Sequence, residues 1–418
     1  MSIFHMMKKL ILFFLLCSHS LMAQLETNLT AWFSFDKVGC AITDEYGDPN
    51  VQTFTNGDLS CVCGVSGNSL RFDGDDDWFY VFGLEIDKAF RTVDFSLSFY
   101  FKTTTSANKT MTLFNKMVDC GPDNSFNISY NTGTRTLFVN LSESNSITGS
   151  LSHVLPYSCW YHIVVVRRGG ETILYVNGEE VRRVVSPGSQ RVNLSNGEPL
   201  IVGHSDCLLS EDFQGFIDEI RLYSRALKRE EVRALYLRPD QIATGLRIDG
   251  KKDTIIFKGN SVSISLTSTC ATGFTWKPAT GVDNPSSPTP LLTPDVTTTY
   301  VLQMEDQHCI ISDSILVTVI DPTDVSCTDV LLPNAFTPNG DFLNDGFGIS
   351  NPYVVGELIS FEIYDRWGNV VFSTTDPLVK WDGTYRGDPV NPGVYLYKIH
   401  FRCEGKEDFK TGSVTVIR

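Results

Sequence analysis

The sequence predicts an all-β protein, in which a large sandwich domain is followed by two smaller β-sandwich domains. Three observations support this: apolar and polar residues alternate with period two, turn-forming pairs separate the alternating runs, and each expected segment contains an even number of cysteines. Successive side chains of a strand point to opposite faces, so this alternation indicates strands. A chain of 418 residues is also too long for one ordinary core, which suggests several domains.

The alternation is clearest in residues 95–101, 161–166, 172–176 and 262–266. Turn pairs in which glycine or asparagine tolerates positive φ separate such runs, and they are Asp73-Gly74, Asn177-Gly178, Asn196-Gly197 and Asn339-Gly340. A fold of hairpins and meanders is therefore expected. Residues 224–237 are the one segment with a helical pattern, with Ser224 as the expected N-cap.

Turn-forming residues interrupt the strand-rich sequence at 238–241 and again at 321–324. We therefore expect three domains, at residues 24–238, 240–321 and 323–418. Six cysteines fall in the first segment and two in each of the others, and these even counts agree with the boundaries.

The first 23 residues have the order of a secretory signal peptide. Lys8 and Lys9 precede the apolar run 10–16, and a short polar stretch leads to Ala23. Cys17 follows Leu16 rather than a small residue, so lipid attachment is not expected. No later apolar run is long enough for a membrane-spanning helix, so we expect no transmembrane segment in the mature chain.

The mature chain is strongly acidic. The whole sequence has a net charge of −15, and removal of residues 1–23 takes away two lysines and no acid, which leaves −17. An acidic surface repels phosphate groups, so nucleic acid and anionic membranes are not expected partners.

Loss of Cys17 with the signal peptide leaves ten cysteines, and disulfides are the expected state in an oxidising compartment. Only Cys61 and Cys63 are closely spaced, which does not fit the paired spacing of a zinc site. The pairing stays open for the six cysteines of the first segment, namely Cys40, Cys61, Cys63, Cys120, Cys159 and Cys207.

In the middle segment, Val262, Ile264, Leu266 and Cys270 share one strand parity, which predicts that Cys270 faces the core beside Trp276. Cys309 is its expected partner. In the last segment we expect Cys327 to pair with Cys403.

The first segment resembles the laminin G-like, concanavalin A-like jelly roll, and five blocks support the resemblance: residues 31–36, 69–74, 160–166, 174–178 and 216–223. It implies two stacked antiparallel sheets with a concave face of the kind that binds sugars or protein partners. It also implies a structural calcium ion that ties the first strand to the last, with Asp36 and Asp218 in the matching places.

The middle segment is similar to immunoglobulin-like or PKD-like modules, through residues 274–281 and 297–302.

The last segment resembles the gliding-motility-associated C-terminal domain, a sorting signal for type IX secretion. Its motifs are residues 332–341, 361–369, 380–383, 392–397 and 412–418, with Phe342 where the family usually has glycine. The resemblance implies passage through the periplasm to an extracellular or cell-surface location and recognition by the type IX secretion machinery.

Two further acidic segments are rich in the oxygen ligands that hard cations prefer. The run Asp73-Gly-Asp-Asp-Asp77 lacks the glycine and the glutamate of an EF-hand, so a tight hairpin with solvated acids is the preferred interpretation. Residues 339–345 are likewise interpreted as a turn-rich loop. His162, which alternates within a strand, is interpreted as a structural residue rather than a ligand.

Concanavalin A-like folds also include glucanases, which need two carboxylates that face one cleft. The only Glu-x-Asp is Glu85-Ile-Asp87, and no second acid follows it. We therefore expect no enzyme activity, although carboxylates from separate strands could still converge.

The leading hypothesis is a surface or secreted protein whose first domain binds a glycan or a cell-surface protein through exposed aromatics. The alternatives are a polysaccharide-degrading enzyme and a structural component of a gliding or surface layer. The sequence does not identify the ligand-binding residues; Trp32, Trp78 and Trp160 are expected to be packing residues.

Overall fold

A computed structural model describes residues 25–91, 94–118, 120–194, 196–206, 210–243, 253–321, 330–338, 344–403 and 405–417. Strands account for 49% of the chain and helices for 7%, which confirms the all-β fold class. The expected signal peptide and the pair Asn339-Gly340 lie outside the described residues. No described helix is long and apolar enough to cross a membrane.

Residue contacts divide the chain into two units. The first contains residues 1–243 together with 265–275 and 302–313, and the second contains 244–264, 276–301 and 314–418. The predicted domain boundaries near residues 239 and 322 stay predictions.

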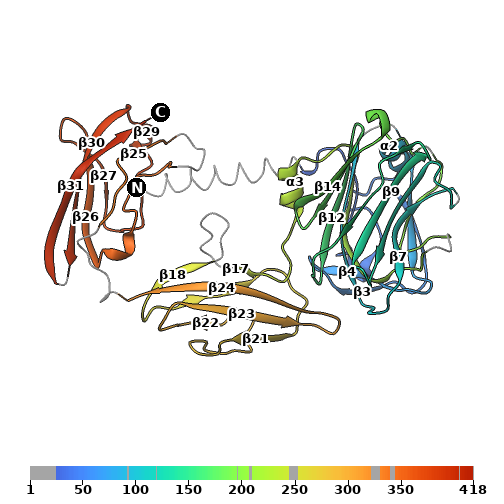
Figure 1. The fold of residues 1–418 in the computed structure, drawn as a ribbon, viewed down its shortest axis with the longest axis horizontal. Helices are drawn as coiled ribbons and strands as arrows, with labels where there is room; N and C mark the ends of the chain where they lie inside the picture. Colours follow the sequence, from blue (N-terminus) through green and yellow to red (C-terminus); the bar gives the residue numbers. More distant parts are fainter. Residues whose placement is uncertain are drawn as a thin grey trace. The chain divides into compact units, whose positions relative to one another are not determined.

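Two large antiparallel sheets form the sandwich of the first unit (Figure 1), which confirms the predicted jelly roll. The first sheet, called sheet A, has the order β14-β13-β12-β6-β16-β4-β3, with β1 also paired to β16. Its strands are β1 (Leu29–Phe33), β3 (Ser60–Cys63), β4 (Asn68–Asp73), β6 (Phe95–Thr103), β12 (Tyr161–Arg168), β13 (Glu171–Val176), β14 (Glu179–Val185) and β16 (Gln214–Tyr223).

The second sheet, called sheet B, has the order β10-β9-β8-β7-β15-β5-β2, with β11 also paired to β9. Its strands are β2 (Gln52–Asn56), β5 (Trp78–Phe82), β7 (Thr110–Lys116), β8 (Ser125–Asn131), β9 (Thr136–Ser144), β10 (Ile147–Thr148), β11 (Leu151–Val154) and β15 (Leu200–Val202). One hydrophobic core lies between the sheets, and aromatic rings such as Phe79, Phe99 and Phe101 are fully buried in it.

The two sheets differ in how many of their faces are buried. Seven of the eight residues of β12 are buried, as are eight of the nine residues of β6, although both strands alternate only partly in polarity. In sheet B, β9 and β5 instead alternate between buried and accessible positions over most of their length. A strand buried at every position has both faces covered. Sheet A is therefore covered on both faces at β6 and β12, although its edge strand β14 is largely accessible. Sheet B leaves its outer face open at β5 and β9, whereas β7 in its middle is buried at six of its seven positions.

Helix α3 (Arg229–Leu235) covers part of the outer face of sheet A. Val232 and Leu235 of the helix pack with Val164 and Tyr223 of the sheet. The helix begins later than the sequence predicted, because Glu231 accepts a hydrogen bond from the Lys228 backbone N–H at 2.7 Å and so caps the helix there. Tyr100 fixes its end by donating to the Leu235 carbonyl at 2.9 Å.

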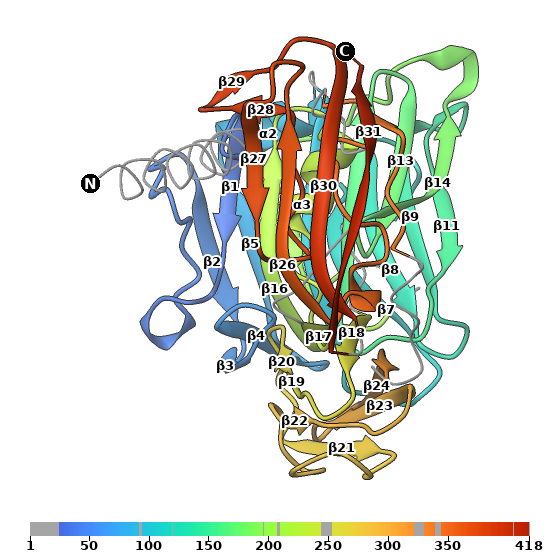
Figure 2. The same cartoon turned by 90° about the vertical axis from the view of Figure 1, so that its left-hand side faces the viewer.

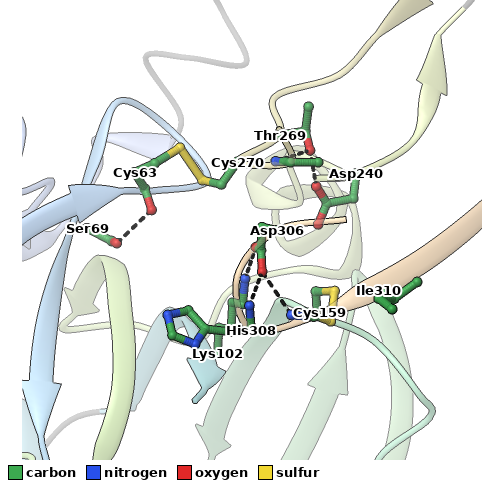
Figure 3. Close-up of polar contacts among 12 residues, drawn as sticks. Cys63, Ser69, Lys102, Cys159, Asp240, Thr269, Cys270, Asp306, His308 and Ile310 are labelled. Atoms are coloured by element: carbon green, nitrogen blue, oxygen red, sulfur yellow. Dashed lines mark hydrogen bonds and ion pairs between the residues drawn. A yellow bond between two sulfur atoms is a disulfide. The ribbon is translucent and has the colours of Figure 1, made fainter. Parts of the chain in front are cut away.

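Two disulfides attach residues 265–275 and 302–313 to the jelly roll (Figure 3). Cys63 at the end of β3 is bonded to Cys270, and Cys159 just before β12 is bonded to Cys309. Around the second bridge, Trp160 and Phe216 of the jelly roll are buried, and Ile311 packs against them.

A buried ion pair lies beside these bridges. Lys102 on β6 has a side chain that is 2% exposed and bonds to the carboxylate of Asp306. Asp306 also accepts hydrogen bonds from the backbone of His308 and Cys309, so it organises the turn that carries Cys309. Burial alone would raise the pKa of the Asp306 carboxyl, but the contacts with Lys102 outweigh it and the pKa lies below its usual range.

The predicted pairing of Cys270 with Cys309 is wrong, since each is bonded to the jelly roll instead. The parity argument extended a strand that ends early: β19 (Val262–Ser263) and β20 (Ser265–Leu266) are separate two-residue strands, and residues 267–272 form none. Cys270 therefore lies beyond the point where strand parity holds.

Cys40 is bonded to Cys61 within the first domain. Cys120 is also disulfide-bonded, while Cys207 lies outside the described residues. The pairing of Cys327 with Cys403 stays a prediction, because Cys327 and the Cys403 side chain lie outside the described part of the chain.

The chain after the jelly roll forms further sheets. A four-stranded sheet with the order β18-β24-β23-β21 is formed by β18 (Thr254–Phe257), β21 (Gly273–Lys277), β23 (Thr298–Glu305) and β24 (Ile310–Ile320). The C-terminal domain has a five-stranded sheet, β25-β31-β30-β26-β27, whose last four strands lie side by side in Figure 2. Its strands are β25 (Ala335–Phe336), β26 (Glu357–Tyr364), β27 (Val370–Thr374), β30 (Gly393–Cys403) and β31 (Lys406–Val416). Phe347, Phe361 and Trp381 are buried in its core.

We expect peptide mapping of the non-reduced mature protein to recover peptides that join Cys63 to Cys270 and Cys159 to Cys309. Replacing both Cys159 and Cys309 by serine should lower the free energy of unfolding by about 2–5 kcal/mol, because the bridge closes a long loop. Denaturant unfolding measures this loss. A peptide that joins Cys270 to Cys309 would contradict the assignment.

Candidate ligand-binding face

One row of side chains crosses the open outer face of sheet B. Residues directly opposite each other in an antiparallel sheet point to the same face. The strand register links six residues in this way, and we call them the cross-sheet row: Phe54, Tyr80, Ile201, Asn115, Asn127 and Asn140. The row changes from aromatic to amide side chains as it crosses the sheet.

The aromatic end of the row is an accessible stack of rings. The ring of Tyr80 lies 5.4 Å from that of Phe54 and 4.9 Å from that of Trp78, measured between centroids. Trp78 in turn stacks on His204 at 5.4 Å, and the His204 Nδ1 atom lies 2.7 Å from Asp212. Phe54 is 55% exposed. Flat rings held in this way offer an apolar surface with polar edges.

Trp78 differs from the expectation that it would be a core residue. It starts β5, is half-buried, and points away from the core between the sheets. Trp160, by contrast, is buried as expected, under the segment that carries Cys309. Trp32 is half-buried, and its Nε1 donates to Glu219 at 3.0 Å.

The amide end of the row borders a groove of about 680 Å³. Asn127 and Asn140 contribute amides, Ser129 and Ser152 contribute hydroxyls, and Phe138 contributes a ring that is 42% exposed. The other lining residues are Thr110, Met117, Cys120, Val139, Ser150, Leu151, Arg182, Val184, Ser205 and Ser210.

The chemistry of the groove suits neutral, hydroxyl-bearing ligands. Amides and hydroxyls both donate and accept hydrogen bonds, so they can pair with sugar hydroxyls in either sense. Next to the groove, Asn115 is buried, and its Oδ1 accepts no hydrogen bond from any residue that the structure describes. None of the described lining residues is an aspartate, glutamate or histidine.

Glu85 and Asp87 do not lie on a strand. They belong to helix α2 (Leu84–Arg91), which the sequence analysis missed. Glu85 pairs with Lys88, and Asp87 lies 3.0 Å from Nζ of the fully buried Lys116. Burial lowers the pKa of Lys116, and the Asp87 carboxylate opposes that shift. Both acids thus take part in ion pairs at the end of the sandwich.

Asp36 and Asp218, the expected calcium ligands, both bind the turn between β3 and β4. Asp36 accepts a hydrogen bond from the Asn68 backbone at 2.7 Å, and Asp218 accepts one from Val65 at 2.7 Å. Burial, followed by the charge of Glu219, raises the pKa of Asp218 to about 8. These contacts do not test for an ion, so calcium at this position stays a prediction.

His162 lies in the covered face of sheet A. It is 1% exposed, its Nε2 lies 3.0 Å from the Ser98 hydroxyl, and its ring stacks on Tyr100 at 4.5 Å. Burial, with a further contribution from the charge of Arg221, lowers its pKa to about 3. The residue is therefore a neutral structural histidine, as the sequence suggested.

Two family models match the chain. Residues 48–233 match the concanavalin A-like lectin/glucanases superfamily, in its laminin G form. Residues 330–416 match the type IX secretion signal domain, which implies export to an extracellular or cell-surface location. No match was found among curated proteins.

Several solved structures are similar at low identity. Domain 4 of AbnA, an extracellular GH43 arabinanase from Geobacillus stearothermophilus solved with arabinotriose, is 20% identical, with a TM-score of 0.38, over 50% of this chain and 98% of that one. The binding domain of botulinum neurotoxin serotype D is 17% identical, with a TM-score of 0.43, over 70% and 74%. Trypanosoma rangeli sialidase, solved with the inhibitor DANA, is 18% identical, with a TM-score of 0.36, over 50% and 32%.

The variant His162→Phe should make the protein less sensitive to acid. The unfolded chain protonates this imidazole below its ordinary pKa of about 6.5, whereas the folded chain keeps it neutral down to about 3. The wild type therefore loses stability as the pH falls through this window, by an amount on the order of 4 kcal/mol, and the variant lacks that loss.

Denaturant unfolding of both proteins between pH 7 and pH 3 checks this prediction. At pH 7 the variant should be slightly less stable, because Ser98 loses a hydrogen-bond partner. His153→Phe, at a half-exposed strand position, is the matched control for loss of an imidazole. A stability difference between wild type and His162→Phe that does not change with pH would contradict the prediction.

Proposed function

We propose that this chain, which combines a concanavalin A-like domain with a type IX secretion signal domain, is an exported protein that binds a neutral glycan on the outer face of sheet B. The observation that carries the proposal is the cross-sheet row, which places the stacked rings of Phe54 and Tyr80 and the accessible amides of Asn127 and Asn140 on one face. Sugar rings have apolar faces and hydroxyl edges. They could lie on Tyr80 and Phe54 while their hydroxyls pair with Asn127 and Asn140.

Charge favours a neutral ligand over an anionic one. Arg182 is the one charged residue among the described residues that line the groove, and the mature chain is strongly acidic. Long-range repulsion disfavours polyanionic glycans. The amides are suited to bind hydroxyl groups without a charge of their own.

Binding without catalysis is the form of the proposal that the groove supports. A glycosidase of the usual type needs two carboxylates on either side of the scissile bond. The described groove residues include none, and Glu85 and Asp87 are engaged in ion pairs elsewhere. The middle and C-terminal segments would then act as spacer and export signal.

The proposal is tested on a neutral-glycan array with the mature chain, residues 24–418. The whole chain is needed because residues 24–238 alone would lack Cys270 and Cys309, the partners of Cys63 and Cys159. For the glycan that binds, Tyr80→Ala and Asn127→Ala should each raise the Kd by about fivefold to tenfold, since each removes one stacking or hydrogen-bonding contact. Isothermal titration measures both constants.

Tyr46→Ala is the matched control, because Tyr46 is 52% exposed and lies near Glu26 and Arg221, away from the cross-sheet row. It should leave the Kd unchanged. Equal losses in Tyr46→Ala and Tyr80→Ala, no binding to any neutral glycan, or release of sugar products would each contradict the proposal.

A further inference from the structure

Three carboxylates meet at the hairpin between β4 and β5, at one end of the sandwich. One oxygen each from Asp73, Asp76 and Asp77 lies within 4.8 Å of the other two. Asp73 and Asp76 are exposed, but Asp77 is only 3% exposed. The hairpin is therefore not the fully solvated acidic turn that the sequence suggested.

Asp77 is buried with an unsatisfied oxygen. Its Oδ2 accepts a hydrogen bond from the Asp73 backbone at 3.0 Å, whereas its Oδ1 forms no hydrogen bond of good geometry with any described residue. Burial raises the pKa of Asp77, and the Asp73 and Asp76 charges add to this, while the Asp73 and Asp58 backbones oppose it. A buried carboxylate oxygen without a partner is costly, so it points to a bound group.

In the part of the chain that the structure describes, no basic residue neutralises this cluster. Among the described residues, no lysine, arginine or histidine forms an ion pair with Asp73, Asp76 or Asp77. Asp212, which binds His204, has a pKa raised by burial and then by the charges of Asp75 and Asp73. The surroundings of the hairpin are thus anionic.

The turn after β2 packs closely against two oxygen atoms of the hairpin. A Cβ atom placed on Gly57 would lie 2.4 Å from the unpartnered Asp77 Oδ1 and 2.6 Å from the Asp76 carbonyl oxygen. Both oxygens therefore lie where a Cβ atom of residue 57 would be, and the φ of 73° at Gly57 also favours glycine. Asn56 holds the Asp76 carbonyl through its Nδ2 at 2.8 Å.

We propose that Asp73, Asp76 and Asp77 bind a calcium ion, with the Asp76 carbonyl oxygen as a further ligand. Carboxylate and carbonyl oxygens on irregular turns are the ligands that calcium prefers, and its flexible coordination suits them better than the strict octahedron of magnesium. The ion would satisfy Asp77 Oδ1 and neutralise the cluster. This inference is independent of the glycan proposal, and the site differs from the expected one at Asp36 and Asp218.

The ion would fix the start of β5, the strand that carries Trp78 and Tyr80. Asp77 directly precedes Trp78, which begins β5 and stacks on Tyr80. Calcium would join this hairpin to the turn at Asn56 and Gly57. The neighbouring indole also supplies a spectroscopic probe, because it can transfer excitation to a terbium ion bound in place of calcium.

The test uses the mature, calcium-stripped chain and the metals alone. Terbium should give luminescence on excitation of tryptophan, calcium should displace it, and calcium should raise the melting midpoint. Asp77→Asn should weaken calcium binding by about tenfold or more, since it removes one charged ligand. Asp76→Asn should do the same, and because Asp76 is exposed, this variant remains informative if Asp77→Asn fails to fold.

Asp75→Asn is the matched control: Asp75 is an exposed acid of the same hairpin that lies outside the three-carboxylate group, and its loss should leave the affinity within about twofold. Trp78→Phe should abolish the sensitised emission while keeping the rise in melting midpoint. Two results would overturn the proposal. One is a wild-type chain with neither response to metal. The other is a response that survives Asp76→Asn and disappears in Asp36→Asn, which would place the ion between the first and last strands.

Discussion

Burial of both faces of sheet A is the constraint on which the rest of the structure depends. A sandwich of two sheets has two outer faces, and either could in principle bind a ligand. Here β6 and β12 are buried at nearly every position, so the outer face of sheet A is closed over these strands. The alternating burial of β5 and β9 leaves the outer face of sheet B accessible to solvent at these two strands. Recognition by the jelly roll is thereby directed to the cross-sheet row and its groove.

Covalent and ionic contacts keep the outer face of sheet A closed. The Cys63–Cys270 and Cys159–Cys309 bridges attach segments from later in the chain, and the buried Lys102 pairs with Asp306 beside them. Removal of Asp306 would leave a buried cation without its partner, which is strongly unfavourable. The first domain is therefore incomplete without residues 265–275 and 302–313, and functional work on it should include them.

Local pattern in the sequence was sufficient for the fold class but not for the pairing of distant residues. Alternation located β6, β12 and β13, because it reports directly on which face of a strand is buried. The prediction that Cys270 faces the core of the middle segment relied on strand parity. It failed because the strand ends at Leu266, four residues before the cysteine. Helix α2 was missed since eight residues are too few for its apolar side to stand out from a strand pattern.

The candidate site could not be predicted, because it depends on strand register. Phe54, Tyr80 and Asn140 belong to strands far apart in sequence, and only the order of sheet B places them in one row. The same limit applies to the acidic hairpin. Its composition was evident, but the burial of Asp77 against Gly57 arises from packing between two turns.

Hydroxyl-radical footprinting of the mature, oxidised chain tests the difference between the two sheets most directly, and it needs no ligand. Side chains react according to their access to water, so Phe54, Tyr80 and Phe138 should be oxidised readily on the open face of sheet B. Trp160 and Phe216, which are 3% and 7% exposed, should stay protected while the two bridges are intact. Oxidation of Trp160 as fast as that of Tyr80 in the oxidised protein would contradict the account.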